Sequence, residues 1–162
     1  MQDLIFPKIR GVALTPMSHP THTPMGRKIG LQFLAAGPEH IGSGLIYAAK
    51  LVGNRHTGVV HGGVVTALID ETAGAAVVQR TKSAYSVATL DLRVDYMRPA
   101  RPERPLFCLA HCHLATRRIA FFRAEAFHTP SRPIAVGTGT FMLGANQTSP
   151  GMIWGMEEVS RS

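Results

Sequence analysis

The segment from Val59 to Glu71, VVHGGVVTALIDE, places one histidine and two glycines directly before an apolar run that ends in two adjacent carboxylates. The first backbone N–H groups of a helix have no partner within the helix, and the aligned peptide dipoles place partial positive charge at that end. If a helix begins here, Gly62 and Gly63 leave those N–H groups open to a ligand. A carbonyl oxygen that gains negative charge during acyl transfer would be stabilised by such donors.

The two carboxylates, Asp70 and Glu71, follow about two helical turns later, in an apolar segment where a carboxylate is costly unless it is hydrogen-bonded or functional. Adjacent helix positions point ~100° apart, so only one of the two can address the same site well. Gly-Gly before a helix is a common turn and Asp-Glu in a helix usually faces solvent, so neither feature alone is specific. Together with His61 they form one composite pattern that fits acyl transfer.

The elements that must position this pattern can be predicted from hydrophobic periodicity. The segment from Gly62 to about Arg80 contains no proline and has apolar residues at helical spacing, which predicts one long helix. The middle of that helix, TAGAAVV, consists of small and branched residues, so we expect neighbouring elements to pack closely against it on several sides. Two short runs before it, IGLQFLAAG and GSGLIYAAKLVG, are separated by GPEH and predict a hairpin.

Downstream of the helix the period changes from 3.6 to 2, which indicates strands. In VATLDLRVDYMRP the apolar residues Leu90, Leu92, Val94 and Tyr96 alternate with Thr89, Asp91, Arg93 and Asp95, which predicts a half-buried strand ending before Pro99. Three further runs, PLFCLAHCHLATR, IAFFRAEAFHT and PIAVGTGTFML, with short turns between them, predict an antiparallel meander of four strands. We expect an α+β fold in which the sheet wraps around the one long helix.

Length and composition limit the other possibilities. The 162 residues suffice for one domain with a full core. The formal charge of +7 permits an anionic partner, but the lysines and arginines form no block, and no nucleic-acid-binding signature is present. The N-terminus lacks the apolar core of a signal peptide, and no run approaches ~20 apolar residues. We therefore expect a cytoplasmic protein that binds neither nucleic acid nor membrane.

The two cysteines, Cys108 and Cys112, are too few for a disulfide framework. At positions i and i+4 of a strand they share one face but lie too far apart to bridge, so we expect them to be reduced and buried. The triplet HCH at 111–113 could suggest a metal site, yet only its two histidines point the same way. We expect neither a metal nor a cofactor.

Several of these segments resemble one known family. HTGVVHGGVVTALIDETAG, ATLDLRVDYMRPAR, RRIAFFRAEAF and AVGTGTFML are similar to the hotdog-fold acyl-CoA thioesterases of the phenylacetate-pathway (PaaI-like) type, over about Ile29 to Leu143. The resemblance implies a hotdog domain over 29–145, preceded by a lead-in at 1–28 and followed by a tail at 146–162. It also implies paired dimers commonly assembled into tetramers, with active sites at the dimer interface.

The resemblance also implies residue roles. Asp70 falls nine residues after His61, where the family places its catalytic carboxylate, and is therefore favoured over Glu71. Gly62 falls where a backbone N–H polarises the thioester carbonyl, and His61 is expected to shape the loop rather than act as a base. The family often has Asn or Gln six residues before this histidine, but here that position is Arg55. A one-residue bulge would bring Asn54 into the role; otherwise His56 or Arg55 fills it, or nothing does.

Further candidates follow from the resemblance and from the surplus of positive charge, which fits a CoA partner. A Ser or Thr near the catalytic carboxylate is expected from the next strand, where Ser86 and Thr89 are candidates on opposite faces. The candidate contacts to the CoA part of the substrate are Gly63, Thr89, Arg98 and Arg101, with Arg93, Arg117 and Arg118 as additional possible phosphate ligands.

The leading functional hypothesis is a thioesterase that hydrolyses an aryl- or medium-chain acyl-CoA to the free acid and CoA. Asp70 would act as general base or as nucleophile, and the sequence does not separate these roles. One alternative is a hotdog hydratase or dehydratase acting on acyl thioesters, for which His61 stands in the wrong motif context. Another is a non-catalytic acyl-CoA binding module, which would need an output domain.

Overall fold

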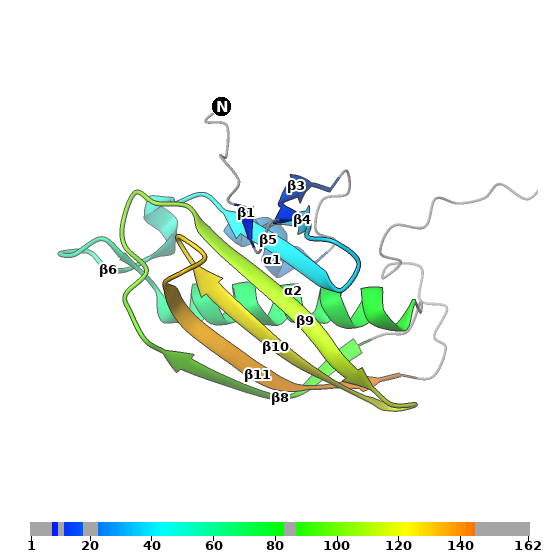
Figure 1. Cartoon of the computed structure of the whole chain (residues 1–162). Helices are drawn as coiled ribbons and strands as arrows, with labels where there is room; N and C mark the ends of the chain where they lie inside the picture. Colours follow the sequence, from blue (N-terminus) through cyan, green and yellow to red (C-terminus); the bar gives the residue numbers. More distant parts are fainter. Residues whose placement is uncertain (1–7, 10–11, 18–22, 83–86, 145–162) are drawn as a thin grey trace, which may run out of the picture.

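The computed structural model describes residues 8–9, 12–17, 23–82 and 87–144. Its main feature is the long helix α2 (Gly62–Thr81), which lies across a curved antiparallel sheet of seven strands (Figure 1). This is the arrangement that the sequence predicts, and the helix bounds agree to within one residue. The predicted role of Trp154 as a packing anchor lies outside the described residues.

The strands of the large sheet are β3 (Thr15–Pro16), β4 (Gln32–Ala35), β5 (His40–Leu45), β8 (Val87–Tyr96), β9 (Leu106–Ala115), β10 (Ile119–Phe127) and β11 (Pro133–Leu143). The remaining elements are β1 (Lys8–Ile9), β2 (Val12–Ala13), α1 (Pro24–Ile29), a 3-10 turn at Ala49–Leu51, β6 (Val52–Asn54) and β7 (Val59–Val60). The predicted first hairpin is β4–β5. Its second run does not continue as one strand, because the 3-10 turn follows β5.

The strand order of the large sheet is β3-β4-β5-β9-β10-β11-β8. The predicted meander of four strands is therefore wrong in one respect: β9, β10 and β11 are consecutive neighbours, but β8 pairs with β11 and not with β9. The reason is that β5 occupies the other edge of β9, with His40 opposite His111. As a result β8 is one of the two edge strands of the described sheet, with β3 at the other edge.

The core lies between α2 and the concave face of the sheet. Leu68, Ile69, Ala73 and Val77 of the helix are fully buried there. The contact is close because β11 has a glycine where the helix approaches, and a Cβ atom on Gly137 would lie 2.5 Å from Ile69 Cγ2. Register shifts between β9 and β10 and between β8 and β11 mark β-bulges, which increase strand twist and help the sheet to curve around the helix.

Both cysteines are free and buried on the helix-facing side of β9, as predicted. Burial raises the pKa of the Cys108 thiol to about 12, against a smaller opposing effect of a hydrogen bond with Thr72, so this thiol stays protonated. The histidines of the HCH triplet share the opposite face, with their ring centroids 6.4 Å apart.

Strand β8 differs from the predicted half-buried strand. Leu92 and Val94 pack partly against the core, but 54% of Leu90 and 51% of Tyr96 are exposed. The cause is the position of β8 at the sheet edge, where it has a strand neighbour on one side only among the described residues. A long edge strand with exposed apolar side chains is a surface suited to pairing with another chain.

Candidate active site

The turn at the start of α2 is shaped by His61. This residue is the N-cap of the helix, and its ring nitrogen Nδ1 accepts a hydrogen bond of 2.9 Å from the Gly63 N–H. The Gly63 N–H is therefore not open to a ligand. The sequence predicted open N–H groups on both glycines, so the prediction is wrong for Gly63. Within the described residues the Gly62 N–H has no acceptor, so this one donor remains at the positive end of the helix dipole.

The carbonyl side of the same turn is held by Tyr96 from β8. The Tyr96 hydroxyl donates to the Gly62 carbonyl oxygen at 2.8 Å and lies 2.6 Å from Thr66 Oγ1. These contacts fix the orientation of the Gly62–Gly63 peptide unit and leave the Gly62 N–H, which belongs to the preceding peptide unit, without an acceptor in the described residues. The sequence predicts Tyr96 as an apolar position of its strand and does not predict this contact, because no local signal connects positions 34 residues apart.

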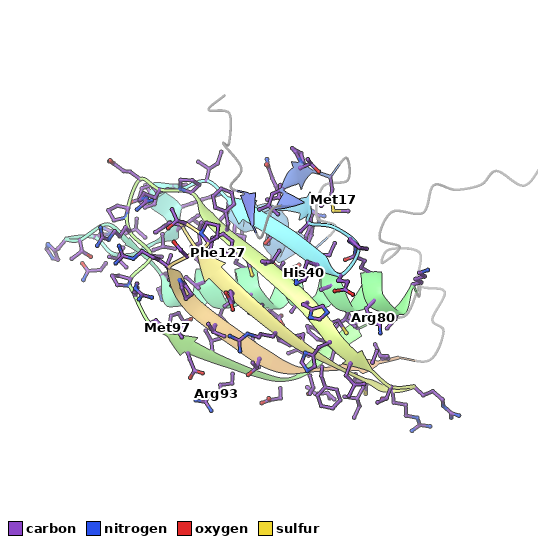
Figure 2. The ribbon with its side chains drawn as sticks, in the orientation of Figure 1. Met17, His40, Arg80, Arg93, Met97 and Phe127 are labelled. Atoms are coloured by element: carbon purple, nitrogen blue, oxygen red, sulfur yellow. The ribbon has the colours of Figure 1, made fainter. Side chains whose placement is uncertain are left out.

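The middle of α2 carries Asp70, which is half-buried and contacts β8. Figure 2 shows the side chains of the helices and the sheet. Thr89 Oγ1 donates a hydrogen bond of 2.8 Å to Asp70 Oδ1, so the structure brings these two candidates together. Strict alternation with Leu92 would turn Thr89 to the outer face. A bulge at Leu90 shifts the register so that Thr89 pairs with the buried Phe141, and this puts Thr89 on the helix-facing side. The competing candidate Ser86 lies outside the described residues.

Glu71 points away from this site, toward α1. Its Oε1 accepts a hydrogen bond of 2.6 Å from Thr23 Oγ1, at the N-cap of α1. Burial raises the pKa of the Glu71 carboxyl, the Thr23 hydrogen bond lowers it, and the neighbouring Asp70 raises it further. Asp70 and Glu71 therefore contact different elements.

The position that the family fills with Asn or Gln lies in the exposed turn after β6. Asn54 Oδ1 accepts backbone hydrogen bonds from His56 at 2.9 Å and from Thr57 at 3.3 Å. The side-chain oxygen of Asn54 thus shapes this turn, which leaves its amide group as the part that could act on a ligand. Arg55 and His56 are exposed in the same turn.

The two candidate arginines lie in the connection between β8 and β9. Arg98 is exposed, and its Nη1 donates to the Pro133 carbonyl oxygen at 2.6 Å. The Arg101 backbone N–H donates to His128 Nε2 at 2.9 Å, and its side chain is exposed. This connection reaches the start of α2, because the Val60 N–H donates to the Ala100 carbonyl oxygen at 3.0 Å.

Gly62 and Asp70 lie on one helix, eight residues apart. At a rise of 1.5 Å per residue they are separated by about 12 Å along the axis. A reacting carbonyl must lie about 3 Å from both its hydrogen-bond donor and the attacking group. If both residues act on the same carbonyl, one copy of the chain therefore presents two candidate half-sites, each built around one of these residues.

Comparison with known proteins identifies the family of this chain. The model of the thioesterase superfamily matches residues 57–135, which include both half-sites. The solved structure of a Pseudomonas aeruginosa protein is 37% identical, with a TM-score of 0.66, and the match covers 73% of this chain and 88% of that one. The chain belongs to the thioesterase superfamily.

Two named relatives are similar to this thioesterase over most of their length. The medium/long-chain acyl-CoA thioesterase YigI of Escherichia coli K12 is 29% identical over 136 residues, which are 76% of this chain and 87% of YigI. The phenylacetic acid degradation protein PaaI of Thermus thermophilus, solved as a mutant, is 27% identical with a TM-score of 0.64, and the match covers 74% of this chain and 98% of PaaI.

The thioesterase has the hotdog fold, with an antiparallel sheet around one long helix, and it is a thioester hydrolase. Of the helices in the described part of the chain, none is both long and apolar enough to cross a membrane.

Proposed function

We propose that this thioesterase hydrolyses acyl-CoA esters with a medium-chain or aryl acyl group to the free acid and CoA. The observation that carries the proposal is that α2 presents both a backbone N–H without an acceptor, on Gly62, and a half-buried carboxylate, on Asp70. Thr89 orients this carboxylate through a hydrogen bond. The Gly62 N–H stabilises the developing oxyanion of the thioester. Asp70 acts on the carbonyl carbon, through an activated water or by direct attack.

The geometry of one chain supports a site shared between two copies. If two copies pair through the exposed edge of β8, a two-fold axis places their α2 helices antiparallel and side by side. An axis that passes between the two helices at the level of Thr66, midway between the half-sites, brings Asp70 of one copy opposite Gly62 of the other. Each dimer then contains two complete sites, and a pair of such dimers forms the tetramer that we propose.

This arrangement predicts that the protein is at least a dimer at micromolar concentration. Leu90→Lys should shift it toward monomer in sedimentation velocity, because a charge on the β8 edge disfavours strand pairing. Leu114→Lys is a matched control, since Leu114 on β9 is 51% exposed and Leu90 is 54% exposed. A wild-type protein that sediments as a stable monomer would contradict the shared site.

The phosphates of CoA need cations near the Gly62 half-site, and the connection between β8 and β9 supplies them. Arg101 and Arg104 both lie near His128. Burial lowers the pKa of this imidazole most, and the charges of Arg104 and Arg101 lower it further, while its hydrogen bond with the Pro105 carbonyl opposes the shift. We propose that Arg98 and Arg101 contact the phosphates, with Arg104 contributing to the positive potential.

The proposal is tested by incubating the purified protein with acyl-CoAs of about two to sixteen carbons and with phenylacetyl- and benzoyl-CoA, with release of free thiol as the readout. We expect thiol release with the highest kcat/KM for medium-chain or aryl substrates. A change in absorbance at the enoyl group without thiol release would indicate a hydratase. Binding without turnover would indicate a sensing module, and either result would overturn the proposal.

A further inference from the structure

Three consecutive side chains of α2 are hydrogen-bonded to hydroxyl groups on three different elements. Asp70 accepts from Thr89 of β8, and Glu71 accepts from Thr23 at the N-cap of α1. Thr72 Oγ1 lies 2.5 Å from Ser43 Oγ of β5. Since Thr72 Oγ1 itself donates to the Leu68 carbonyl oxygen at 2.5 Å, Ser43 is the donor in that pair.

The Ser43–Thr72 pair lies in the deepest part of the core. Both side chains are fully buried, and they are the two polar residues in the buried set of the described chain. A buried hydroxyl without a partner costs free energy, and the hydrogen-bond partner of the Ser43 hydroxyl in the described structure is Thr72, so Thr72 must face β5 for Ser43 to be satisfied. This pair therefore specifies which side of α2 faces β5.

The close contact of Ile69 with Gly137 limits rotation of the helix on its sheet-facing side, but the turn after position 72 adds less resistance. The turn that follows consists of Ala73, Gly74, Ala75 and Ala76, all buried. Such small side chains interlock with their neighbours less than large side chains do. In contrast, adjacent helix positions point about 100° apart, so the three bonds at positions 70–72 act in three directions around the helix axis.

We propose that these three bonds together form a clamp that sets the rotation of α2, and that Glu71 and Thr72 are thereby positioning residues for Asp70. The proposal rests on the catalytic role proposed for Asp70. At a side-chain radius of about 5–6 Å, a rotation of about 10° moves the end of a side chain by about 1 Å. A displacement of this size can lower kcat by about 10²-fold when it misplaces a reacting group.

The first test is made at Thr72. Thr72→Val keeps the shape but removes the hydroxyl, and we expect kcat to fall by about 10-fold or more with little change in KM. Thr72→Ser restores the hydroxyl and should restore kcat. Thr81→Val is a matched control, because the Thr81 hydroxyl also donates to the carbonyl four residues earlier but forms no hydrogen bond to another element in the described structure. We expect Thr81→Val to leave kcat unchanged.

The second test is made at Glu71, on the surface side of the clamp. Glu71→Ala removes the acceptor for Thr23 and should lower kcat, whereas Glu71→Gln keeps an oxygen acceptor and should retain it. All assays are made well below the melting temperature of each variant, which is measured separately. If Thr72→Val unfolds, Glu71→Ala and Glu71→Gln still test the clamp.

The outcomes separate this proposal from the one on which it rests. If Asp70→Asn abolishes thioester hydrolysis while Thr72→Val and Glu71→Ala are folded and retain wild-type kcat, the clamp is wrong and the proposed function stands. If Asp70→Asn retains activity, the catalytic role of Asp70 is wrong. A fall in kcat that Thr72→Ser and Glu71→Gln reverse supports the clamp, since a purely structural loss would affect stability without this pattern.

Discussion

Asp70→Asn should lower kcat for acyl-CoA hydrolysis by about 10²- to 10⁴-fold, because it removes the charge that activates water or attacks the carbonyl. Asparagine has nearly the same size and still accepts the hydrogen bond from Thr89, so the side chain should keep its place. The fold should remain intact, as circular dichroism and the oligomeric state can verify. The measurement is steady-state thiol release with the best substrate of the panel.

Glu71→Gln is the matched control for this substitution. It makes the same chemical change at the adjacent position, but Glu71 faces Thr23 and α1 rather than β8. We expect its effect on kcat to be small. If Glu71→Gln abolished hydrolysis while Asp70→Asn retained it, the assignment of the catalytic carboxylate would be wrong by one residue.

Gly62→Pro should lower kcat by about 10²- to 10³-fold, because proline has no N–H to donate to the oxyanion. The local geometry accepts proline well. Gly62 is the first residue of α2, where proline is common, and His61 has φ −61° and ψ 133°, the extended conformation that favours a following proline. A loss of activity can therefore be assigned to the missing donor rather than to a broken helix.

Gly62→Ala provides the control for the second prediction. A Cβ atom at this position would lie 3.5 Å from the Tyr96 hydroxyl oxygen, which is an ordinary contact distance. The variant keeps the N–H and should retain kcat close to that of the wild type. If the alanine and proline variants were equally impaired, the open space at Gly62 rather than its N–H would be the important feature.

The sequence predicted the long helix, because a 3.6-residue period without proline continues from Gly62 to the end of α2. It also predicted the alternating strands, and through the family resemblance it implied Asp70 and Gly62 as the centres of the site, which stays a prediction. These features depend on local spacing. The pairing of β8 with β11 does not depend on local spacing, because it follows from the pairing of β5 with the other edge of β9.

The resemblance implied Thr89 as one of two candidates beside Asp70, but local spacing could not predict the contacts that orient the site, for the same physical reason. Thr89 faces Asp70 only because a bulge at Leu90 reverses the alternation of β8, and a bulge depends on the register of two strands. Thr23, Ser43 and Tyr96 reach α2 across long separations in the chain. The occupation of the Gly63 N–H by His61 depends on the rotamer of a capping side chain.

The shared site can be tested by combining two inactive variants in one dimer. Asp70→Asn and Gly62→Pro subunits with different affinity tags are co-expressed, and the mixed dimer is purified through both tags. Each mixed dimer should contain one site with an intact Asp70 from one copy and an intact Gly62 from the other, so its activity should recover to about half that of the wild-type dimer. A mixed dimer as inactive as its two parents would contradict a site that combines Asp70 and Gly62 from different copies.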